Sequence, residues 1–306
     1  MCNFVLLWQF VFLNQLKLNF CHQSISCSMK NTIVPFLHQT CRNAIYPRSN
    51  GVKRFTVPDN LVNWMEKYTE YKPEFYESSS LVGAPYADPA IDDTNFHPIW
   101  NSIDGKIDRT SFHGEYEIRD KYPLNVAGRT GVAGRGLLGR WGVNHAADPI
   151  VTKWKRSNDG TIVKHTTSGR NIVQMVAIQR RDTLEWAIPG GMVDAGEKAT
   201  ATLKREFIEE AMNSNKVQEI DRFFEKNGTE IYSGYVDDPR NTDNAWIETT
   251  AFNFHDDTGD TLKDIKFEAG DDAGSVRWLD LDRNIELYAN HHDIVSKVAE
   301  RLNAHW

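Results

Sequence analysis

A spaced set of glutamate residues constrains this 306-residue chain more than any other feature. Glu206, Glu209 and Glu210 are spaced i, i+3 and i+4, so a helix places the three carboxylates on one face within a single turn. A solvated acidic face is the common explanation of such a pattern. Carboxylates at this density are also the hard oxygen ligands of Mg²⁺, which bridges to substrate phosphates. The loop at residues 187–192 adds backbone amides at the helix start, where they favour an anion.

The residues before the glutamates complete a longer motif. Gly191, Glu197, Arg205, Glu206 and the two later glutamates follow the pattern G-x5-E-x7-R-E-U-x-E-E, where U is apolar. This pattern resembles that of the Nudix hydrolases. A chance match at its six fixed positions has a probability on the order of 10⁻⁵ in a chain of this length, which outweighs the solvated-face interpretation. One departure is Met212, which stands where the family pattern has a glycine at the helix end.

Further segments resemble one Nudix subfamily, the mitochondrial ADP-ribose pyrophosphatases, and the related ADP-ribose-sensing domain of melastatin-type channels. These segments are residues 134–149, 185–197, 236–249, 268–274 and 287–290, within a likeness that covers about residues 55–306. The motif is degenerate in the channel domain and keeps every acid here. The resemblance therefore implies metal-dependent hydrolysis of ADP-ribose to AMP and ribose 5-phosphate. The alternatives are Nudix hydrolysis of another nucleoside diphosphate derivative and a non-catalytic ADP-ribose sensor.

The resemblance also implies roles for single residues. Glu206, Glu209 and Glu210, with Gly191 beside them, are expected to hold Mg²⁺ or Mn²⁺. Glu197 and Arg205 are expected to form an ion pair that aims Glu206. The catalytic set is therefore Glu197, Arg205, Glu206 and Glu209.

The substrate-binding residues implied by the resemblance are His145, Asp238, Arg240, Leu287 and Asn290. Arg240 is the strongest candidate, because a guanidinium can bind ribose or phosphate oxygens bidentately. A turn at Asp238, core packing at Leu287 and a helix cap at Asn290 are structural alternatives. A loop acid could share the role of general base with Glu206, and the candidates are Glu268, Asp271 and Asp272, for which a solvated loop is the alternative.

The hydrophobic patterns after residue 149 predict an α/β fold. Strands are expected at 172–179, 231–236, 246–254 and 275–281, and helices at 198–213, 216–226 and 292–304. Together with the resemblance, they predict a Nudix α/β/α sandwich with a mixed sheet over residues 149–306, preceded by a loop-rich N-terminal lobe at 55–148. Residues 134–139 satisfy G-x-G-x-x-G, but a preceding strand and a following helix are missing, so a loop is expected there.

The first 54 residues have a different composition from the rest. No acid occurs before residue 59, and all four cysteines lie before residue 42. The apolar run at 4–13 is shorter than the roughly 20 residues of a membrane span. We interpret residues 1–54 as a targeting or disordered leader of a mitochondrial or cytoplasmic protein, and expect the body to fold and act without it.

The body carries a strongly negative charge. From residue 59 onward, 29 basic residues stand against 42 acidic ones. Such a body repels phosphate backbones at long range. The expected partner is therefore a small-molecule substrate and not nucleic acid, and the expected state is a monomer without a membrane span.

Overall fold

Two long strands form the centre of the sheet in the computed structural model, which describes residues 37–42, 45–211, 217–263 and 273–306. They are β7 (Gly142–Trp154) and β12 (Ala245–Asp256). The two strands pair in parallel along most of their length. Nearly all of their residues are buried, as is typical of strands covered by helices on both faces.

All other neighbouring strands of this sheet pair antiparallel, so the sheet is mixed. β11 (Gly228–Tyr235) pairs with β12, β8 (Val173–Arg180) with β7, and β13 (Ala273–Asp280) with β8. Two short strands complete the sheet, β9 (Trp186–Ala187) against β8 and β10 (Gly191–Met192) against β7. The last pairing holds Gly191 next to the central strand.

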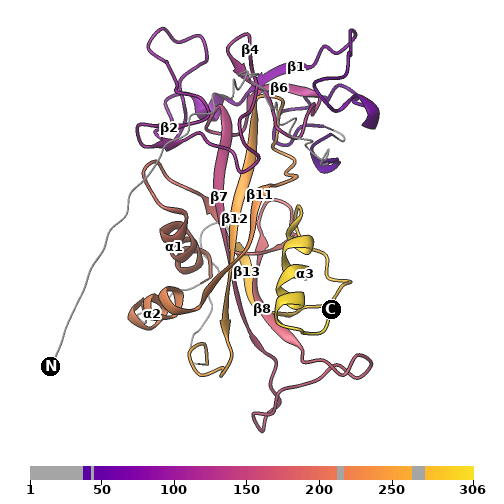
Figure 1. The fold of residues 1–306 in the computed structure, drawn as a ribbon, viewed down its shortest axis with the longest axis vertical. Helices are drawn as coiled ribbons and strands as arrows, with labels where there is room; N and C mark the ends of the chain where they lie inside the picture. Colours follow the sequence, from indigo (N-terminus) through magenta and orange to yellow (C-terminus); the bar gives the residue numbers. More distant parts are fainter. Residues whose placement is uncertain (1–36, 43–44, 212–216, 264–272) are drawn as a thin grey trace, which may run out of the picture. The chain divides into compact units, whose positions relative to one another are not determined.

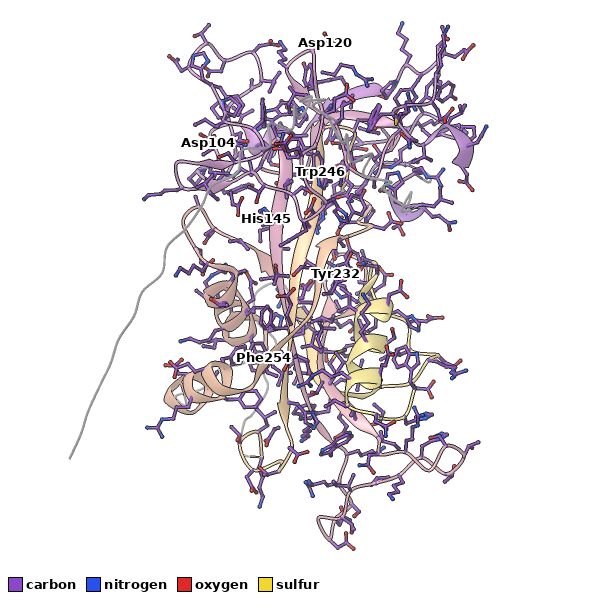
Figure 2. The ribbon with its side chains drawn as sticks, in the orientation of Figure 1. Asp104, Asp120, His145, Tyr232, Trp246 and Phe254 are labelled. Atoms are coloured by element: carbon purple, nitrogen blue, oxygen red, sulfur yellow. The ribbon has the colours of Figure 1, made fainter. Side chains whose placement is uncertain are left out.

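Helices cover both faces of the sheet (Figure 1). They are α1 (Ala199–Ala211), α2 (Val217–Asn227) and α3 (His291–Arg301). Phe207 of α1 and Phe224 of α2 pack with Ala147 of β7, whereas Val298 of α3 packs with Ile150 of the same strand. Alternate residues of β7 thus serve the two layers. Figure 2 shows Phe254 of β12 on the side of α1 and α2. The predicted α/β/α sandwich with a mixed sheet is confirmed.

The predicted elements of the sandwich agree with the observed ones to within three residues at each end. The central strand β7 was missed by the sequence analysis. Its residues 146–149 read Ala-Ala-Asp-Pro, and alanine, aspartate and proline are all depleted in strands. Tertiary burial between two helix layers overrides this weak local preference.

The N-terminal lobe is built from short strands and turns, as expected. Its strands are β1 (Glu74–Glu77), β2 (Ile103–Asp104), β3 (Ile107–Asp108), β4 (Ile118–Arg119), β5 (Tyr122–Pro123) and β6 (Val132–Gly136). Its 3-10 turns are η1 (Thr40–Arg42), η2 (Asp59–Leu61) and η3 (Ser79–Leu81). The G-x-G-x-x-G run begins in β6, which pairs in parallel with β1, so its first residues form a strand and not the expected loop. A turn and then β7 follow β6, and no dinucleotide-binding helix begins there.

Two expected boundaries do not match the structure. The boundary between residues 148 and 149 falls inside β7, which begins at Gly142. Residues 37–42 and 45–54, expected to belong to a dispensable leader, pack against the body. His38 and Tyr46 are 0% and 1% exposed, and the His38 ring lies 3.0 Å from the hydroxyl of Tyr235 in β11. Residues 1–36 lie outside the described residues. None of the described helices has the length and apolar character needed to cross a bilayer.

Candidate active site

Arg205 connects the carboxylates of the motif on α1. Its guanidinium donates to Glu197 at 2.9 and 3.1 Å, to Glu206 at 2.8 Å and to Glu209 at 3.0 Å. Thr202 donates a further bond to Glu197 at 2.8 Å. The structure therefore brings together the four residues predicted as the catalytic set, with Arg205 between the three acids.

Two consecutive glycines accommodate two carboxylates beside β7. A β-carbon at Gly191 would lie 2.4 Å from the carboxylate of Glu206, and one at Gly190 would lie 2.1 Å from Oδ1 of Asp148. Neither contact is possible for an alanine without a shift of the carboxylate or the backbone. The absence of side chains at Gly190 and Gly191 is thus a steric requirement of this site.

The electrostatics of Glu206 suit a hard divalent cation. Burial raises the pKa of Glu206 to about 7, although Arg205 opposes this effect. The ion pairs with Arg205 therefore leave part of the cost of burying this charge uncompensated. Glu209 lines the same cavity and supplies a second oxygen donor. The residues present fit a divalent metal in donor type and charge.

A preformed metal cage is not seen among the described residues, where no group of three or more His, Cys, Asp or Glu side chains is arranged to hold an ion. The backbone of Glu210 belongs to α1, but its side chain lies outside what the structure describes. Glu268, Asp271 and Asp272 also lie outside the described residues. Their predicted roles remain predictions.

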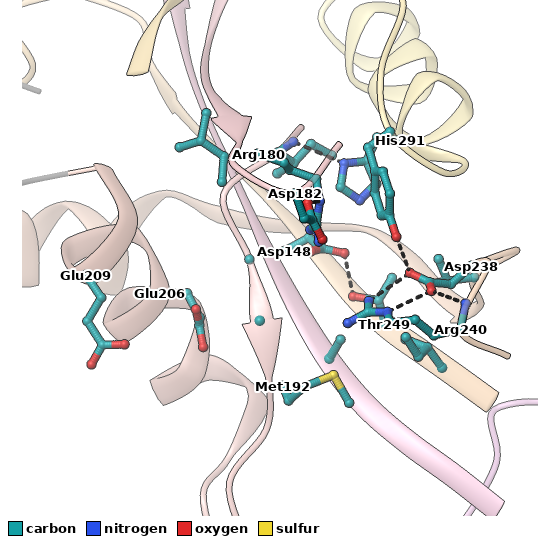
Figure 3. Close-up of a pocket in the computed structure, with 18 of the residues that line it drawn as sticks. Asp148, Arg180, Asp182, Met192, Glu206, Glu209, Asp238, Arg240, Thr249 and His291 are labelled. Carbon is teal, nitrogen blue, oxygen red and sulfur yellow. Dashed lines mark hydrogen bonds and ion pairs between the residues drawn. The ribbon is translucent and has the colours of Figure 1, made fainter. Parts of the chain in front are cut away.

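A cavity of about 690 Å³ joins the motif to the loop that follows β11. Glu206 and Glu209 line it together with Asp238 and Arg240. Figure 3 shows Glu206 on α1 and Arg240 on different sides of the strand segment that carries Met192. The structure therefore places predicted metal ligands and two predicted substrate-binding residues around one cavity.

Three predicted substrate-binding residues are not among those that line this cavity. His145 lines a second cavity of about 480 Å³, and its Nε2 lies 3.0 Å from the carbonyl oxygen of Thr110. Leu287 packs at the edge of the α3 core, and Asn290 occupies the N-cap position of α3. Successive side chains of β7 point to opposite faces of the sheet, so His145 points away from the face on which Ala146 and Asp148 line the larger cavity. Leu287 packs with the α3 core instead. The predicted role of these three residues in substrate binding stays a prediction.

Asp238 and Arg240 form a bidentate ion pair at the wall of the cavity. Nε and Nη2 of Arg240 donate to the two oxygens of Asp238, each at 2.8 Å. The Tyr288 hydroxyl donates to the same carboxylate at 3.1 Å. Burial raises the pKa of Asp238, but Arg240 more than offsets this and holds the pKa below its usual value. The bidentate pair with Asp238 therefore fixes the orientation of the Arg240 guanidinium.

Several residues around the cavity were missed by the sequence analysis. They are Arg48, Asp148, Arg180, Asp182, Thr249, Tyr288 and His291. Tyr288 and His291 adjoin Leu287 and Asn290, so the predicted 287–290 segment does border the cavity. The backbone N–H of Ile188 donates to Nδ1 of His291 at 3.0 Å, and burial lowers the pKa of His291 to about 4. His291 therefore presents a neutral ring at physiological pH.

Asp148 provides a test of the electrostatics. Burial raises its pKa from 3.8 to about 6, although Thr249 donates to it at 2.6 Å. Between these two pKa values the folded protein binds more protons than the unfolded chain, so this residue makes folding less favourable as the pH rises. Asp148→Asn removes the effect and can still accept the bond from Thr249. The variant should gain up to about 3 kcal/mol in unfolding free energy over the wild type between pH 4 and pH 6.

Urea unfolding of both proteins at pH 4, 5, 6 and 7, in the presence of a chelator, measures this difference. Asp260→Asn, the same substitution at an exposed position, serves as the control. A constant difference for Asp148→Asn would contradict the raised pKa.

Known protein families match both the N-terminal and the C-terminal part of the chain. Residues 57–142 match the family described as NUDT9-like, N-terminal domain, and residues 161–301 match the NUDIX domain. The chain is 50% identical over 279 residues to the mitochondrial ADP-ribose pyrophosphatase of Rattus norvegicus, covering 88% of this chain and 79% of that protein. It is 47% identical over 282 residues to the transient receptor potential cation channel subfamily M member-like 2 of Nematostella vectensis, covering 88% of this chain and 18% of the channel.

Proposed function

We propose that this chain, which belongs to the Nudix hydrolase family, hydrolyses the diphosphate of ADP-ribose to AMP and ribose 5-phosphate. The observation that carries this proposal is the common cavity that joins the Arg205-linked carboxylates to the Asp238–Arg240 pair. A diphosphate that bridges two ribosyl groups needs both parts, one for the reacting phosphorus and one for a sugar or phosphate. The 50% identity to a mitochondrial ADP-ribose pyrophosphatase supports the same substrate.

We propose that Glu206, Glu209 and Glu210, with the backbone at Gly191, hold the metal, and that the metal is Mg²⁺ or Mn²⁺. When bound, such an ion lowers the pKa of a water and neutralises charge on the diphosphate oxygens. The protein's own contribution is orientation. Arg205 donates hydrogen bonds to Glu206 and Glu209 on one side of the cavity. Its further bond to Glu197 fixes the position of its own guanidinium. Glu206 or one of the loop acids accepts the proton of the attacking water.

In this proposal Arg240 binds ribose or phosphate oxygens of ADP-ribose. Arg240→Lys keeps the positive charge but loses the planar guanidinium, which pairs with Asp238 through Nε and Nη2 and can turn Nη1 toward ligand oxygens. We expect the KM for ADP-ribose to rise about tenfold or more, with a smaller change in kcat. Because Asp238 is buried, the melting temperature should also fall.

Steady-state kinetics and thermal melts of the same preparations measure both effects. Arg119→Lys is the matched control, because Arg119 also forms a bidentate pair with a carboxylate two residues earlier, Glu117, at an exposed site. A normal KM with a lowered melting temperature in Arg240→Lys would assign Arg240 a purely structural role.

A substrate panel tests the proposed function directly. ADP-ribose, NADH, diadenosine polyphosphates and ADP-sugars are incubated with Mg²⁺ or Mn²⁺, and AMP release is measured. We expect the highest kcat/KM with ADP-ribose. A higher value with another compound would assign the activity to a different nucleoside diphosphate derivative. Binding of ADP-ribose without AMP release would instead support a sensor, like the domain that the channel relative suggests.

We further propose a monomeric mitochondrial protein with a small-molecule substrate and no nucleic-acid partner. The mitochondrial relative supports the location, and the acidic body supports the choice of partner. Residues 1–36, which would carry a targeting signal, lie outside the described residues. Microscopy of the full chain with a C-terminal tag would test the location, and light scattering would test the oligomeric state.

A further inference from the structure

We propose that the N-terminal segment, residues 37–42 and 45–54, is required for normal substrate affinity. In this proposal Tyr46 and Arg54 hold the 238–241 loop in the conformation that binds the substrate. Tyr46 and Arg54 are thus positioning residues that act through Arg240. This inference rests on the proposed function, because the 238–241 loop is the part of the cavity to which we assign substrate recognition.

Tyr46 joins the N-terminal segment to the loop through one buried hydroxyl. It donates to the carbonyl oxygen of Arg240 at 2.6 Å and accepts from the backbone N–H of Leu137 at 2.9 Å. The residue is 1% exposed. A β-carbon at Gly136 would lie 1.9 Å from this hydroxyl, so the glycine leaves the space that the bridge occupies. The Tyr46 hydroxyl therefore satisfies two backbone groups at once, the carbonyl of Arg240 and the N–H of Leu137.

Arg54 holds the loop residues on either side of Arg240. Its Nη2 donates to the carbonyl oxygens of Pro239 at 2.6 Å and Asn241 at 3.1 Å, and its guanidinium lies 5.0 Å from the centre of the Tyr46 ring. The carbonyls of residues 239, 240 and 241 thus all accept hydrogen bonds from the N-terminal segment. Buried carbonyls that lose such partners are costly, so the segment strongly favours one conformation of the loop.

Asp237, the residue before the loop, is also bound to the N-terminal segment. Its carboxylate accepts the backbone N–H groups of Gln39 at 2.7 Å, Thr40 at 2.8 Å and Cys41 at 3.0 Å. These three N–H groups lie in or next to the short turn η1, where a carboxylate is a favourable partner. The N-terminal segment is therefore hydrogen-bonded to four of the five residues from 237 to 241.

Arg48 extends the segment to the rim of the cavity. It pairs with Asp182, which also forms a bidentate pair with Arg180 at 2.9 and 3.0 Å. Asp182 thus joins the N-terminal segment to the end of β8, and both arginines line the cavity. The segment consequently contributes to the wall of the site as well as to its support.

These contacts predict a selective effect on substrate affinity. The side chain of Arg240 projects from a backbone whose carbonyl is held by Tyr46, and its own N–H donates to Asp238 at 2.8 Å. If the carbonyl loses its partner, the guanidinium of Arg240 shifts with the backbone. The carboxylates on α1 are held by Arg205 instead. Loss of the Tyr46 hydroxyl should therefore raise KM and leave kcat nearly unchanged.

Tyr46→Phe tests the proposal, with Tyr71→Phe as a closely matched control. The hydroxyl of Tyr71 also donates to one acceptor at 2.6 Å, Asp243, and accepts from one backbone N–H, that of Gly131, at 3.0 Å. Both variants should lower the melting temperature. Only Tyr46→Phe should raise the KM for ADP-ribose, by about five- to tenfold, with kcat within about twofold of the wild type. Assays are run well below both melting temperatures.

An unchanged KM in folded Tyr46→Phe, or an equal rise in both variants, would overturn the proposal. Arg54→Lys provides a second arm, because a single ammonium cannot reproduce the guanidinium's contacts to Pro239 and Asn241. It should also raise KM, and an unchanged KM in this variant would likewise count against the proposal. Failure of the wild type to release AMP would contradict the proposed function instead. The inference would then be tested by the affinity for ADP-ribose, measured by calorimetry on the same proteins.

Discussion

Replacing Glu206 with glutamine should lower kcat by at least about 1,000-fold, the largest effect we expect from a single substitution. The amide has the shape of the carboxylate and can still lie against Gly191, but it carries no charge for a divalent cation. Because a metal ligand acts mainly on the transition state, the KM for ADP-ribose should change much less than kcat. AMP release at saturating Mg²⁺ or Mn²⁺ measures the effect.

Folding should survive this substitution. Burial disfavours the charged form of Glu206, and Arg205 keeps its bonds to Glu197 and Glu209. The melting temperature measured in chelator should therefore stay close to that of the wild type. Glu300→Gln, an identical substitution at an exposed position of α3, should leave kcat unchanged. Near-normal turnover of Glu206→Gln would rule out the proposed metal site.

Gly191→Ala should lower kcat by about 100-fold or more, because one methyl group displaces the carboxylate of Glu206. The new β-carbon would lie 2.4 Å from all three atoms of that carboxylate. Gly191 does not have a positive φ, so the effect should come from lost space and not from backbone strain. Steady-state AMP release and a thermal melt report catalysis and folding separately.

Gly274→Ala is the matched control for this change. Gly274 also lies in a strand without a positive φ, and the nearest atom to a β-carbon there is 3.5 Å away, an ordinary contact. The control should have normal kinetics. If Gly191→Ala also had normal kcat, the close fit between Gly191 and Glu206 would have no role in turnover, and the carboxylate would have to be held by Arg205 alone.

The elements around the motif were predictable because their signals are local. The spacing of Glu206 and Glu209 specifies a helix face, and Arg205 lies within the same turn as both. The ion pair of Arg205 with Glu197 spans only eight residues. Strands β8, β11, β12 and β13 and the described helices α1, α2 and α3 also have short, regular hydrophobic patterns. Such features depend on neighbours in the chain and can be recognised without a tertiary structure.

Other parts of the site depend on contacts between distant residues. Whether His145 faces the cavity depends on the register of β7, and β7 itself has weak strand propensity at residues 146–149. Tyr288 and His291 reach the cavity because α3 packs on the face of the sheet opposite α1. A resemblance at the level of segments could indicate the 287–290 region, but it could not specify which side chains point inward.

The amino-acid sequence by itself determined the helix that carries the motif, its glutamates and the sandwich architecture, since periodicity and residue type act over a few positions. Only the tertiary structure decided which residues enclose the cavity and that residues 37–42 and 45–54 lie against it. The bond from Tyr46 to Arg240 joins residues 194 positions apart. Such a contact leaves no periodic trace in either segment, because it exists only after folding has brought the two backbones together and excluded water from them.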